Sequence, residues 1–412
     1  MPRLVQIVHG FPPRENAGTE RVAARAADAL RARGWEVHTL AATRAPGEAM
    51  YSTFEEPHVS RLVTNAPFAS LRLGGADPAA RAWIESRLQA LSPDVVHVHH
   101  LANLDPDFRT HAPMVWTLHD AWAWCAAGGQ LMREGAACAG PGPDCAACAT
   151  AWCQDGPAVA LALGVAGRLA PLVAPSRLHR LWGRLPAAWR SAATRGASPV
   201  TAEQIDARTG RWQRFAARCA VRIAPSRWIG EEAARRGLGT TLHLPNGVSP
   251  GPARVGGGPF LFLGTLAHHK GPDLVVAAHT RAGVDIPLLL HGPPGPDAAY
   301  AAALPHSGPI ADPSEALARA AALVLGSRWP ENAPLVVLEA RAAGCPVIAP
   351  DVGGLRELVE PGVDGWLYEV GNVEALAACI RSAVATPRPP VRPPLSMSEH
   401  ADRLVGVYDS LR

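Results

Sequence analysis

The first part of the chain alternates short apolar runs with stretches of helical periodicity. A continuous apolar run at Leu4–Val8 precedes a helical apolar stripe over Thr19–Arg33, and Gly34 stands where a helix C-cap belongs. Further strands are expected at Trp35–Leu40, Val95–Val98, Val115–Leu118, Val221–Ala224 and Leu242–Leu244. Short β-branched runs without polar alternation, separated by helices, are typical of a parallel sheet covered on both faces.

A second series of the same kind follows a break. The run Asn246–Pro259 (NGVSPGPARVGGGP) has no apolar pattern and predicts a flexible linker. Strands are then expected at Phe260–Leu263, Pro287–Leu290, Leu323–Leu325, Val347–Ala349 and Trp366–Tyr368. Helices are expected near Pro272–Arg281, Ser314–Ala321, Pro334–Ala343, Val373–Val384 and Ser396–Leu411. The pattern predicts two doubly wound α/β domains, residues 1–250 and 258–390, facing each other across a cleft.

Composition and charge limit the classes of protein to which the chain can belong. The 412 residues are 48% hydrophobic and 18% charged, which is typical of a globular protein with two or three domains. The net charge of +3 does not favour a nucleic acid as the main partner. No apolar run approaches the roughly 20 residues that span a bilayer, and the start, MPRLVQIVHG, does not resemble a signal peptide. We therefore expect a cytoplasmic protein.

Five of the eight cysteines lie within 29 residues, in a Gly- and Ala-rich segment, 125–153, that looks like an insertion. Cys125, Cys138, Cys145 and Cys148 could supply four thiolates, and the last two have zinc-knuckle spacing, with Cys153 as a spare. A reducing compartment favours metal over disulfides, so a structural zinc ion is the first interpretation, with disulfides and free thiols as alternatives.

The segment from Ser327 to Glu339 (SRWPENAPLVVLE) carries the strongest chemical signal. It follows an expected strand, and Pro334 suits the first turn of a helix because its missing N–H costs nothing there. Glu331 then lies just before the helix and Glu339 in its second turn. Free backbone N–H groups at such a helix start, here those of Asn332 and Ala333, attract phosphate, and carboxylates accept hydrogen bonds from sugar hydroxyls. Two glutamates eight apart are weak evidence without this context.

The longer run ENAPLVVLEARAAGCPVIAPDVGGLRELVEPGVDGWLYE resembles the signature of glycosyltransferase family 4, an E-x7-E motif followed by EA-x-A-x-G-x-PV-I-A and GG-x-x-E. The resemblance implies the GT-B fold, with two Rossmann-like domains and a terminal helix, 395–412, that packs back on the first domain. It also implies that Glu331, Asn332, Ala333, Pro334 and Leu335 contact the donor sugar and phosphate, and that Glu339 contacts the ribose.

Two further segments bear on the donor phosphates. GFPPRENAGTERVAARAADAL resembles the family's opening, in which a glycine-rich loop runs into the first helix; Gly18 occupies the second glycine, while Ala17 replaces the first. FLFLGTLAHHKG resembles the segment in which the family clamps the diphosphate with an Arg and a Lys. Lys270 matches the Lys, but Thr265 stands in the place of the Arg and cannot offer its bidentate fork. Either another cation, such as Arg328, compensates, or Lys270 and the backbone suffice.

Histidines mark the first-domain wall of the expected cleft. His119 follows a strand, in the sequence TLHD, where the resemblance implies contact with the donor sugar near the reaction centre. His97, His99 and His100 could form a metal cluster, but no carboxylate stands at ligand spacing, so we favour a structural role. No catalytic divalent metal is expected, since the nearest D-x-D motif, Asp105–Asp107, does not stand in a suitable loop.

The resemblance implies a retaining glycosyltransferase that moves a hexose-type sugar from a UDP or GDP donor to an acceptor hydroxyl. The acceptor is expected to be a cell-surface glycan or a lipid-linked intermediate, and alternatively a small secondary-metabolite aglycone. The basic stretch Arg177–Arg195 could contact the inner face of a membrane peripherally or be a solvated helix face. A GT-B epimerase, a phosphorylase and a non-catalytic sugar-binding relative are the alternatives from other classes. The sequence leaves the oligomeric state open.

Overall fold

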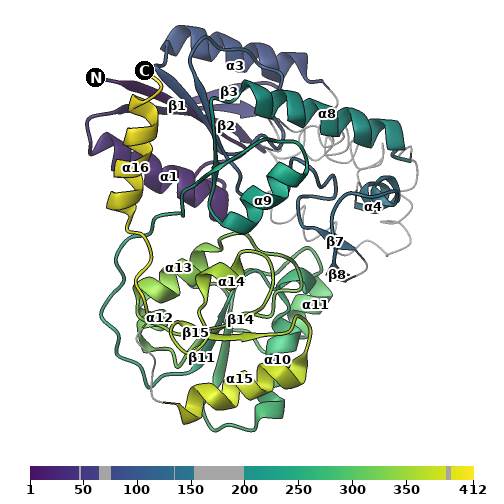
Figure 1. Cartoon of the computed structure of the whole chain (residues 1–412), viewed down its shortest axis with the longest axis vertical. Coiled ribbons are helices and arrows are strands. Elements are labelled where there is room, and N and C mark those ends of the chain that lie inside the picture. Colours follow the sequence, from purple (N-terminus) through teal and green to yellow (C-terminus); the bar gives the residue numbers. More distant parts are fainter. Residues whose placement is uncertain (46–47, 65–75, 134, 153–198, 387–390) are drawn as a thin grey trace.

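Two parallel β-sheets, one in each half of the chain, organise the structure (Figure 1). The computed structural model describes residues 1–45, 48–64, 76–133, 135–152, 199–386 and 391–412. The predicted α/β fold with two Rossmann-like domains is confirmed. The basic stretch Arg177–Arg195 and Cys153 lie outside the described residues.

The first sheet has eight strands in the order β10-β9-β6-β5-β1-β2-β4-β3. All neighbours are parallel except the β3–β4 pair. Its strands are β1 (Arg3–Val8), β2 (Glu36–Thr43), β3 (Thr53–Glu56), β4 (Val59–Val63), β5 (Val95–Val98), β6 (Met114–Thr117), β9 (Val221–Ala224) and β10 (Leu242–His243). Residues 4–8 of β1 are all buried, as a central strand covered on both faces requires.

The second sheet has five parallel strands in the order β12-β11-β13-β14-β15. These are β11 (Phe260–Leu263), β12 (Leu288–His291), β13 (Leu323–Val324), β14 (Val347–Pro350) and β15 (Gly365–Tyr368). Phe260 and Phe262 of β11 pack with α10 and α15 on one face, whereas Leu261 packs with α12 and α13 on the other. Alternate side chains of one strand therefore fill two different cores.

Helices cover both sheets, and the N-terminal ends of some of them contribute to the site. In the first domain they are α1 (Gly18–Arg31), α3 (Pro78–Leu91), α4 (Cys145–Trp152), α8 (Ala202–Arg218) and α9 (Arg227–Arg235). In the second domain they are α10 (Pro272–Ala282), α11 (Ala298–Ala302), α12 (Ser314–Arg319), α13 (Leu335–Ala342), α14 (Leu355–Leu358) and α15 (Val373–Ala385), with a 3-10 turn at His268–Lys270.

The connection between the domains is held by hydrogen bonds, in contrast to the flexible linker that its composition predicts. The backbone N–H of Val248 donates to Leu395, and Met397 donates to Val248, so the two crossings between domains run side by side. Further along, Val255 and Gly256 both donate to the carbonyl of Ala318 at the end of α12. Pairing to fixed partners overrides the freedom that glycine and proline give an isolated linker.

The last helix, α16 (Met397–Asp409), returns to the first domain and lies beside α1 (Figure 1). Leu404 and Tyr408 join a core with Leu30 and Trp35. The hydroxyl of Tyr408 is hydrogen bonded to Nδ1 of His97 at 2.6 Å, inside the first sheet. The helix is therefore part of the first domain's core.

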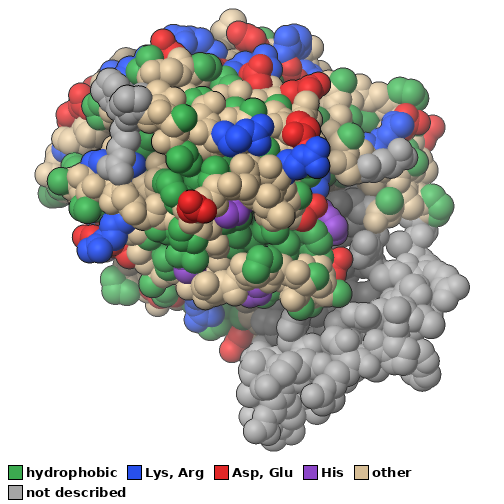
Figure 2. All heavy atoms as spheres, turned by 90° about the horizontal axis from the view of Figure 1, so that it is seen from below, with side chains coloured by type: hydrophobic (Ala, Val, Ile, Leu, Met, Phe, Trp, Pro, Cys, Tyr) green, Lys and Arg blue, Asp and Glu red, His purple; other side chains and the backbone are tan. Residues whose placement is uncertain are grey.

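Figure 2 shows the molecule from below, and on this face basic and acidic side chains are interspersed among apolar and other groups. Such a mixed surface fits the small net charge of +3. Among the residues that the structure describes, no helix combines the length and the apolar character needed to cross a bilayer.

Candidate active site

A cavity of about 810 Å³ lies between the two domains. Its first-domain wall comes from the loops after β1, β2, β5 and β6 and from the start of α1, and its second-domain wall from the loops after β11 and β13. These are the carboxyl ends of parallel strands, where doubly wound sheets bind ligands. Of the predicted site residues, the cavity is lined by Gly18, His119, Thr265, Lys270, Glu331, Asn332, Ala333, Pro334 and Leu335.

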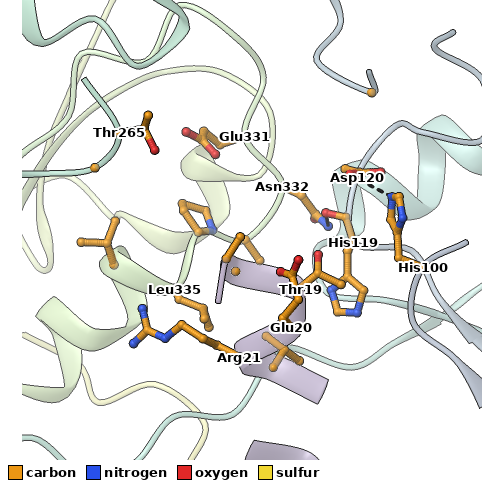
Figure 3. A pocket seen from close by; sticks show the side chains of 18 of the residues that line it. Thr19, Glu20, Arg21, His100, His119, Asp120, Thr265, Glu331, Asn332 and Leu335 are labelled. Atoms are coloured by element: carbon orange, nitrogen blue, oxygen red, sulfur yellow. Dashed lines mark hydrogen bonds and ion pairs between the residues drawn. The ribbon is translucent and has the colours of Figure 1, made fainter. Parts of the chain in front are cut away.

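Glu331 is held in this cavity by three donors. Its Oε1 accepts hydrogen bonds from Nζ of Lys270 at 2.6 Å, Oγ of Ser327 at 2.9 Å and Nε1 of Trp329 at 2.8 Å. Within the described residues no donor is bonded to Oε2, so one oxygen of a fixed carboxylate remains open to a ligand. Glu331 and Thr265 face each other from two second-domain loops in Figure 3.

Lys270 owes its position to a close approach of two glycines. Gly271 follows it with φ of 59°, and a Cβ there would lie 2.0 Å from the carbonyl oxygen of Gly326. A Cβ on Gly326 would in turn lie 2.1 Å from the oxygen of Gly271. Only two glycines allow this contact. It brings the Lys270 turn against the loop that carries Glu331, and the Lys270 ammonium also sits 4.8 Å from the Trp329 ring centre.

Asn332 joins the two domains. Its Nδ2 donates to the carbonyls of Leu118 at 3.0 Å and His119 at 2.9 Å, and its Oδ1 accepts from Oγ of Ser226 at 2.7 Å. Figure 3 shows the Asn332 side chain pointing toward His119. Both polar atoms of this amide are engaged with the first domain. The loop of residues 327–334, named the donor loop for its predicted role, and the loop that carries His119 are therefore held in one arrangement.

The donor loop lies directly on Gly353 and Gly354, which belong to the GG-x-x-E part of the motif. A Cβ on Gly353, whose φ is 57°, would lie 2.4 Å from the oxygen of Glu331, and one on Gly354 would lie 2.0 Å from the oxygen of Asn332. Glu357, three residues on, accepts from the backbone N–H groups of Arg227 and Trp228 at the start of α9. The motif therefore supports the site and joins the domains.

Helix α13 begins at Leu335, one residue later than the predicted start, and Pro334 occupies the N-cap position without a side-chain cap. Helix α1 begins at Gly18 and likewise has no side-chain cap at Ala17. A Cβ on Gly18 would meet no atom within 4 Å, so this helix start is open to the cavity. Uncapped N–H groups of two helices thus face one cavity, an arrangement that favours anions.

Glu339 does not line the cavity. Its Oε1 accepts from the guanidinium of Arg21 at 2.5 Å and from that of Arg25 at 2.8 Å, both on α1 of the first domain. The carboxylate predicted to contact ribose is thus ion-paired across the domain boundary.

Arg328, named as one cation that could replace the missing phosphate arginine, also does not line the cavity. Its guanidinium forms two hydrogen bonds to Asp273, at 2.9 and 2.6 Å, and donates to the carbonyl of His268. The hydrogen bond to Asp273 raises the pKa of Arg328. This bidentate pair holds the Arg328 side chain against Asp273 within the second domain.

Three connected histidines extend from the sheet into the cavity wall. His97 is bonded to Thr117 and Tyr408, and its ring stacks on that of His99 with centroids 4.2 Å apart. Nδ1 of His99 is 3.1 Å from Nε2 of His119. His97 and His99 therefore lie on one face, as their alternation predicts, and they position His119 structurally.

Burial of these histidines makes the free energy of unfolding depend on pH in a way that can be tested. It lowers the pKa of His97 to about 3 and the pKa values of His99 and His119 well below 6.5. Unfolded histidines take up protons near pH 6.5 while these remain neutral, so acid favours the unfolded state. The free energy of unfolding is expected to fall below pH 6.5 by up to about 1.4 kcal/mol per histidine per pH unit.

Denaturant unfolding at pH 7.5 and 5.5 measures this loss. In His97→Gln the loss should shrink by about one histidine's share, whereas His111→Gln, at an exposed position, should leave it unchanged. Equal free energies of unfolding at the two pH values would contradict the assignment.

The remaining first-domain wall carries two carboxylate–histidine pairs that the sequence did not single out. Glu20 lies 3.1 Å from His9, and Asp120 lies 3.4 Å from His100. Burial is the largest influence and raises the pKa of Glu20, but the hydrogen bond and charge of His9, a backbone hydrogen bond and the charge of His100 together lower it below its usual value. Oε2 of Glu20 is buried without a partner. The residue follows Gly18 in the first turn of α1, which is the signal that could have identified it.

The cysteine insertion forms a second, small cavity of about 60 Å³ beside a two-stranded hairpin, β7 (Met132–Arg133) and β8 (Ala136–Ala137). Cys125, Cys138, Cys145 and Cys148 all line it as free thiols. Backbone N–H groups point at two sulfurs, Gly140 at Cys138 and Gly142 at Cys145. Within the described residues, however, no three His, Cys, Asp or Glu side chains are grouped so that they could hold a metal ion.

Asp105 and Asp107, the nearest D-x-D match, are bound to arginines of the first domain. Arg211 donates to both carboxylates, at 2.5 and 2.8 Å, and Arg81 donates to Asp105 at 3.0 Å. These ion pairs join α3 and α8 to the loop after β5, and neither aspartate lines the cavity between the domains.

Two Rossmann-like domains that face each other across a cavity at their strand ends are the architecture of the GT-B class of glycosyltransferases. The model of "Glycosyltransferase Family 4" matches residues 16–137, and that of "Glycosyl transferases group 1" matches residues 254–401. The chain therefore belongs to the family 4 type of GT-B glycosyltransferases.

Similar curated proteins match over short stretches. D-inositol 3-phosphate glycosyltransferase of Rhodococcus erythropolis is 31% identical over 165 residues, 34% of this chain and 35% of that protein. The amylovoran biosynthesis glycosyltransferase AmsK of Erwinia amylovora is 42% identical over 50 residues, 12% of each chain. The alignments thus span about a third or less of these relatives' own length.

Solved structures match over nearly the whole chain and show the fold. Sucrose-phosphate synthase from Thermosynechococcus elongatus has a TM-score of 0.59 at 18% identity, covering 99% of this chain and 95% of that one. Anabaena HepE, whose structure is a complex with UDP-glucose, has a TM-score of 0.58 at 15% identity, covering 99% and 98%.

Proposed function

We propose that the protein is a retaining glycosyltransferase that moves a hexose from a UDP or GDP donor to an acceptor hydroxyl. The observation that carries the proposal is Glu331, fixed by three donors on one oxygen and open on the other, beside Lys270 and two uncapped helix starts. A sugar, a diphosphate and their developing charges would each meet a suitable partner in one cavity. The UDP-glucose complex of HepE supports a nucleotide-sugar donor.

In the proposed reaction the bond from the anomeric carbon to the donor phosphate breaks, and its electron pair stays with the departing diphosphate. A bond from the acceptor oxygen forms on the same face, and the acceptor proton passes to a phosphate oxygen. The residues then act by position and charge. Lys270 and the helix starts hold the diphosphate, Glu331 holds sugar hydroxyls, and His119 lines the reaction centre in its neutral form.

Acceptor recognition is assigned to the first-domain wall. The unpartnered oxygen of Glu20 and the carboxylate of Asp120 would accept hydrogen bonds from a hydroxyl-rich acceptor. We propose a cell-surface glycan or a lipid-linked intermediate as the acceptor, which fits the names of two similar proteins, the amylovoran biosynthesis glycosyltransferase AmsK and an exopolysaccharide phosphotransferase of Streptomyces coelicolor. A secondary-metabolite aglycone is the alternative, supported by the fold shared with AviGT4, which is involved in avilamycin A biosynthesis.

The proposed function is tested by calorimetry with a panel of UDP- and GDP-sugars, followed by an assay of diphosphate release with and without acceptor. Release that depends on an acceptor hydroxyl, with the anomeric configuration kept in the product, supports a retaining transferase. Donor rearrangement without an acceptor points to an epimerase, and binding without turnover to a sugar-binding relative.

A structural zinc ion in the cysteine insertion is proposed alongside this function, because four thiols line one cavity and backbone N–H groups already face two of the sulfurs. The thiols are not grouped as metal ligands in the structure, so zinc would have to draw them together on binding. Purified protein is expected to hold about one zinc per chain, and Cys148→Ser to lose it. Cys379→Ser, in the second domain, should keep the metal. Zinc-free protein with four titratable thiols at these positions would refute the proposal.

A further inference from the structure

The cavity between the domains carries less positive charge than a bound diphosphate would need for neutralisation. Histidines aside, its cationic lining among the described residues consists of Arg21, Arg44 and Lys270. The ammonium of Lys270 lies 2.6 Å from the carboxylate of Glu331, which offsets its charge. A diphosphate in a nucleotide sugar carries about two negative charges, so at least one further cation is needed for balance.

The second domain does not supply that cation at the expected places. Thr265 lines the cavity but carries no charge. Arg328 is held by both oxygens of Asp273. Burial raises the pKa of Asp273, but the hydrogen bonds from Arg328 and Tyr300 and the charge of Arg328 together lower it. Moving Arg328 to the cavity would leave Asp273 without its charged partner, which is costly for a half-buried carboxylate.

Arg21 is placed to fill the gap from the other domain. It lies three residues after Gly18 on α1, and it lines the cavity. In Figure 3 its side chain lies beside Leu335, at the uncapped start of α13. Of the two first-domain arginines in the lining, Arg21 is the one that reaches α13, through its 2.5 Å contact with Glu339.

Arg21 can turn from Glu339 toward a ligand in the cavity because the Glu339 carboxylate is shared with a second arginine. Glu339 Oε1 accepts from both Arg21 and Arg25, so either arginine could leave without stripping the carboxylate of its charge partner. Arg25 does not line the cavity, and its NH1 is buried without a partner. Arg21 can therefore reach a ligand in the cavity, whereas Arg25 would stay paired with Glu339.

We propose that Arg21 is the cation that pairs with the donor diphosphate in place of the arginine missing at position 265. The inference rests on the proposed function, since it presumes a nucleotide-sugar donor. When the donor binds, ribose hydroxyls and Arg25 take over Glu339, and the Arg21 guanidinium turns to the phosphate oxygens. The phosphate clamp is then built from both domains, so donor binding also draws them together.

The test compares Arg21→Gln with Arg25→Gln, because both residues bind the same oxygen of Glu339 and only one lines the cavity. Binding of a diphosphate and of its nucleoside, UDP against uridine and GDP against guanosine, is measured by calorimetry. Arg21→Gln is expected to weaken diphosphate binding by about ten- to a hundredfold and nucleoside binding by less than threefold. Arg25→Gln, at a residue that does not line the cavity, should change the ratio of the two affinities clearly less than Arg21→Gln does.

Nucleoside binding also reports that each variant is folded. Arg21→Lys, which keeps the charge, should recover part of the lost diphosphate affinity. Equal losses for nucleoside and diphosphate, or matching behaviour of the two glutamine variants, would overturn the role of Arg21 and assign it to domain packing. A wild-type protein that binds neither diphosphate would instead defeat the proposed function itself, so the two failures are distinguishable.

Discussion

Glu331→Ala is expected to lower the turnover of sugar transfer by about 10²–10³-fold, because it removes a fixed carboxylate from the centre of the proposed donor site. The three groups that donate to Oε1, on Lys270, Ser327 and Trp329, would lose their common acceptor. If the carboxylate acts mainly in the transition state, kcat falls while KM changes little. Steady-state kinetics with the best donor of the panel measures the split.

The matched control is Glu374→Ala, which removes an exposed second-domain carboxylate on α15 that pairs with Arg281. It should keep turnover within about twofold, since surface ion pairs contribute little. Circular dichroism should show both variants folded. Near-wild-type turnover of Glu331→Ala would exclude the assigned donor site.

Gly354→Ala is expected to cost about 10²-fold in kcat/KM, although this residue does not line the cavity. Its new methyl group would lie 2.0 Å from the oxygen of Asn332 and 2.9 Å from Cβ of Ser226, so the donor loop has to move. A displacement of about 1 Å at a reacting site is enough for such a loss. Overpacking of this kind should also lower the free energy of unfolding by about 1–3 kcal/mol.

Gly406→Ala provides the control for the same change of residue. Gly406 is exposed on α16 and a Cβ there would meet no atom within 4 Å. Alanine should raise helix stability by up to about 1 kcal/mol and leave transfer unchanged. Full activity in Gly354→Ala would show that the donor loop is not fixed by its contact with the glycine pair.

The sequence predicted the strands of both sheets well where they are buried on both faces. Val95–Val98, Val221–Ala224 and Phe260–Leu263 are short, mainly apolar runs, and the structure begins and ends these strands at the same residues. The strands β3 and β4 were missed because β3 is polar and partly exposed, and because β4 contains a buried arginine, Arg61, two of whose partners, Phe11 and Glu15, are distant in sequence.

Helices α3 and α9 are among the helices that were not predicted, each for its own reason. Helix α3 has a buried stripe of Ala80, Ile84 and Leu88 and a side-chain N-cap at Asp77, so its signal was present in the sequence. Helix α9 spans only nine residues, Arg227–Arg235, and its start is fixed by Glu357 of the other domain. A short helix stabilised by a partner 130 residues away has little local signal.

The same limit applies to the site. A local motif was enough to predict that Glu331 and its neighbours share a loop before a helix. The ion pairs were not predictable from the sequence. Glu339 pairs with Arg21 over a separation of 318 residues, and Arg328 pairs with Asp273 instead of lining the cavity. Which cation serves a phosphate is decided by distances between domains, and no spacing along the chain encodes those distances.

The return of α16 to the first domain has a consequence for the order in which the protein is made. Leu404 and Tyr408 complete a core whose other members, among them Leu4 and Leu30, leave the ribosome hundreds of residues earlier. The first domain therefore cannot finish folding until the second domain has been translated. A nascent chain arrested before residue 397 should expose Leu30 and Trp35, leave His97 without the Tyr408 hydroxyl, and depend on chaperones for its solubility.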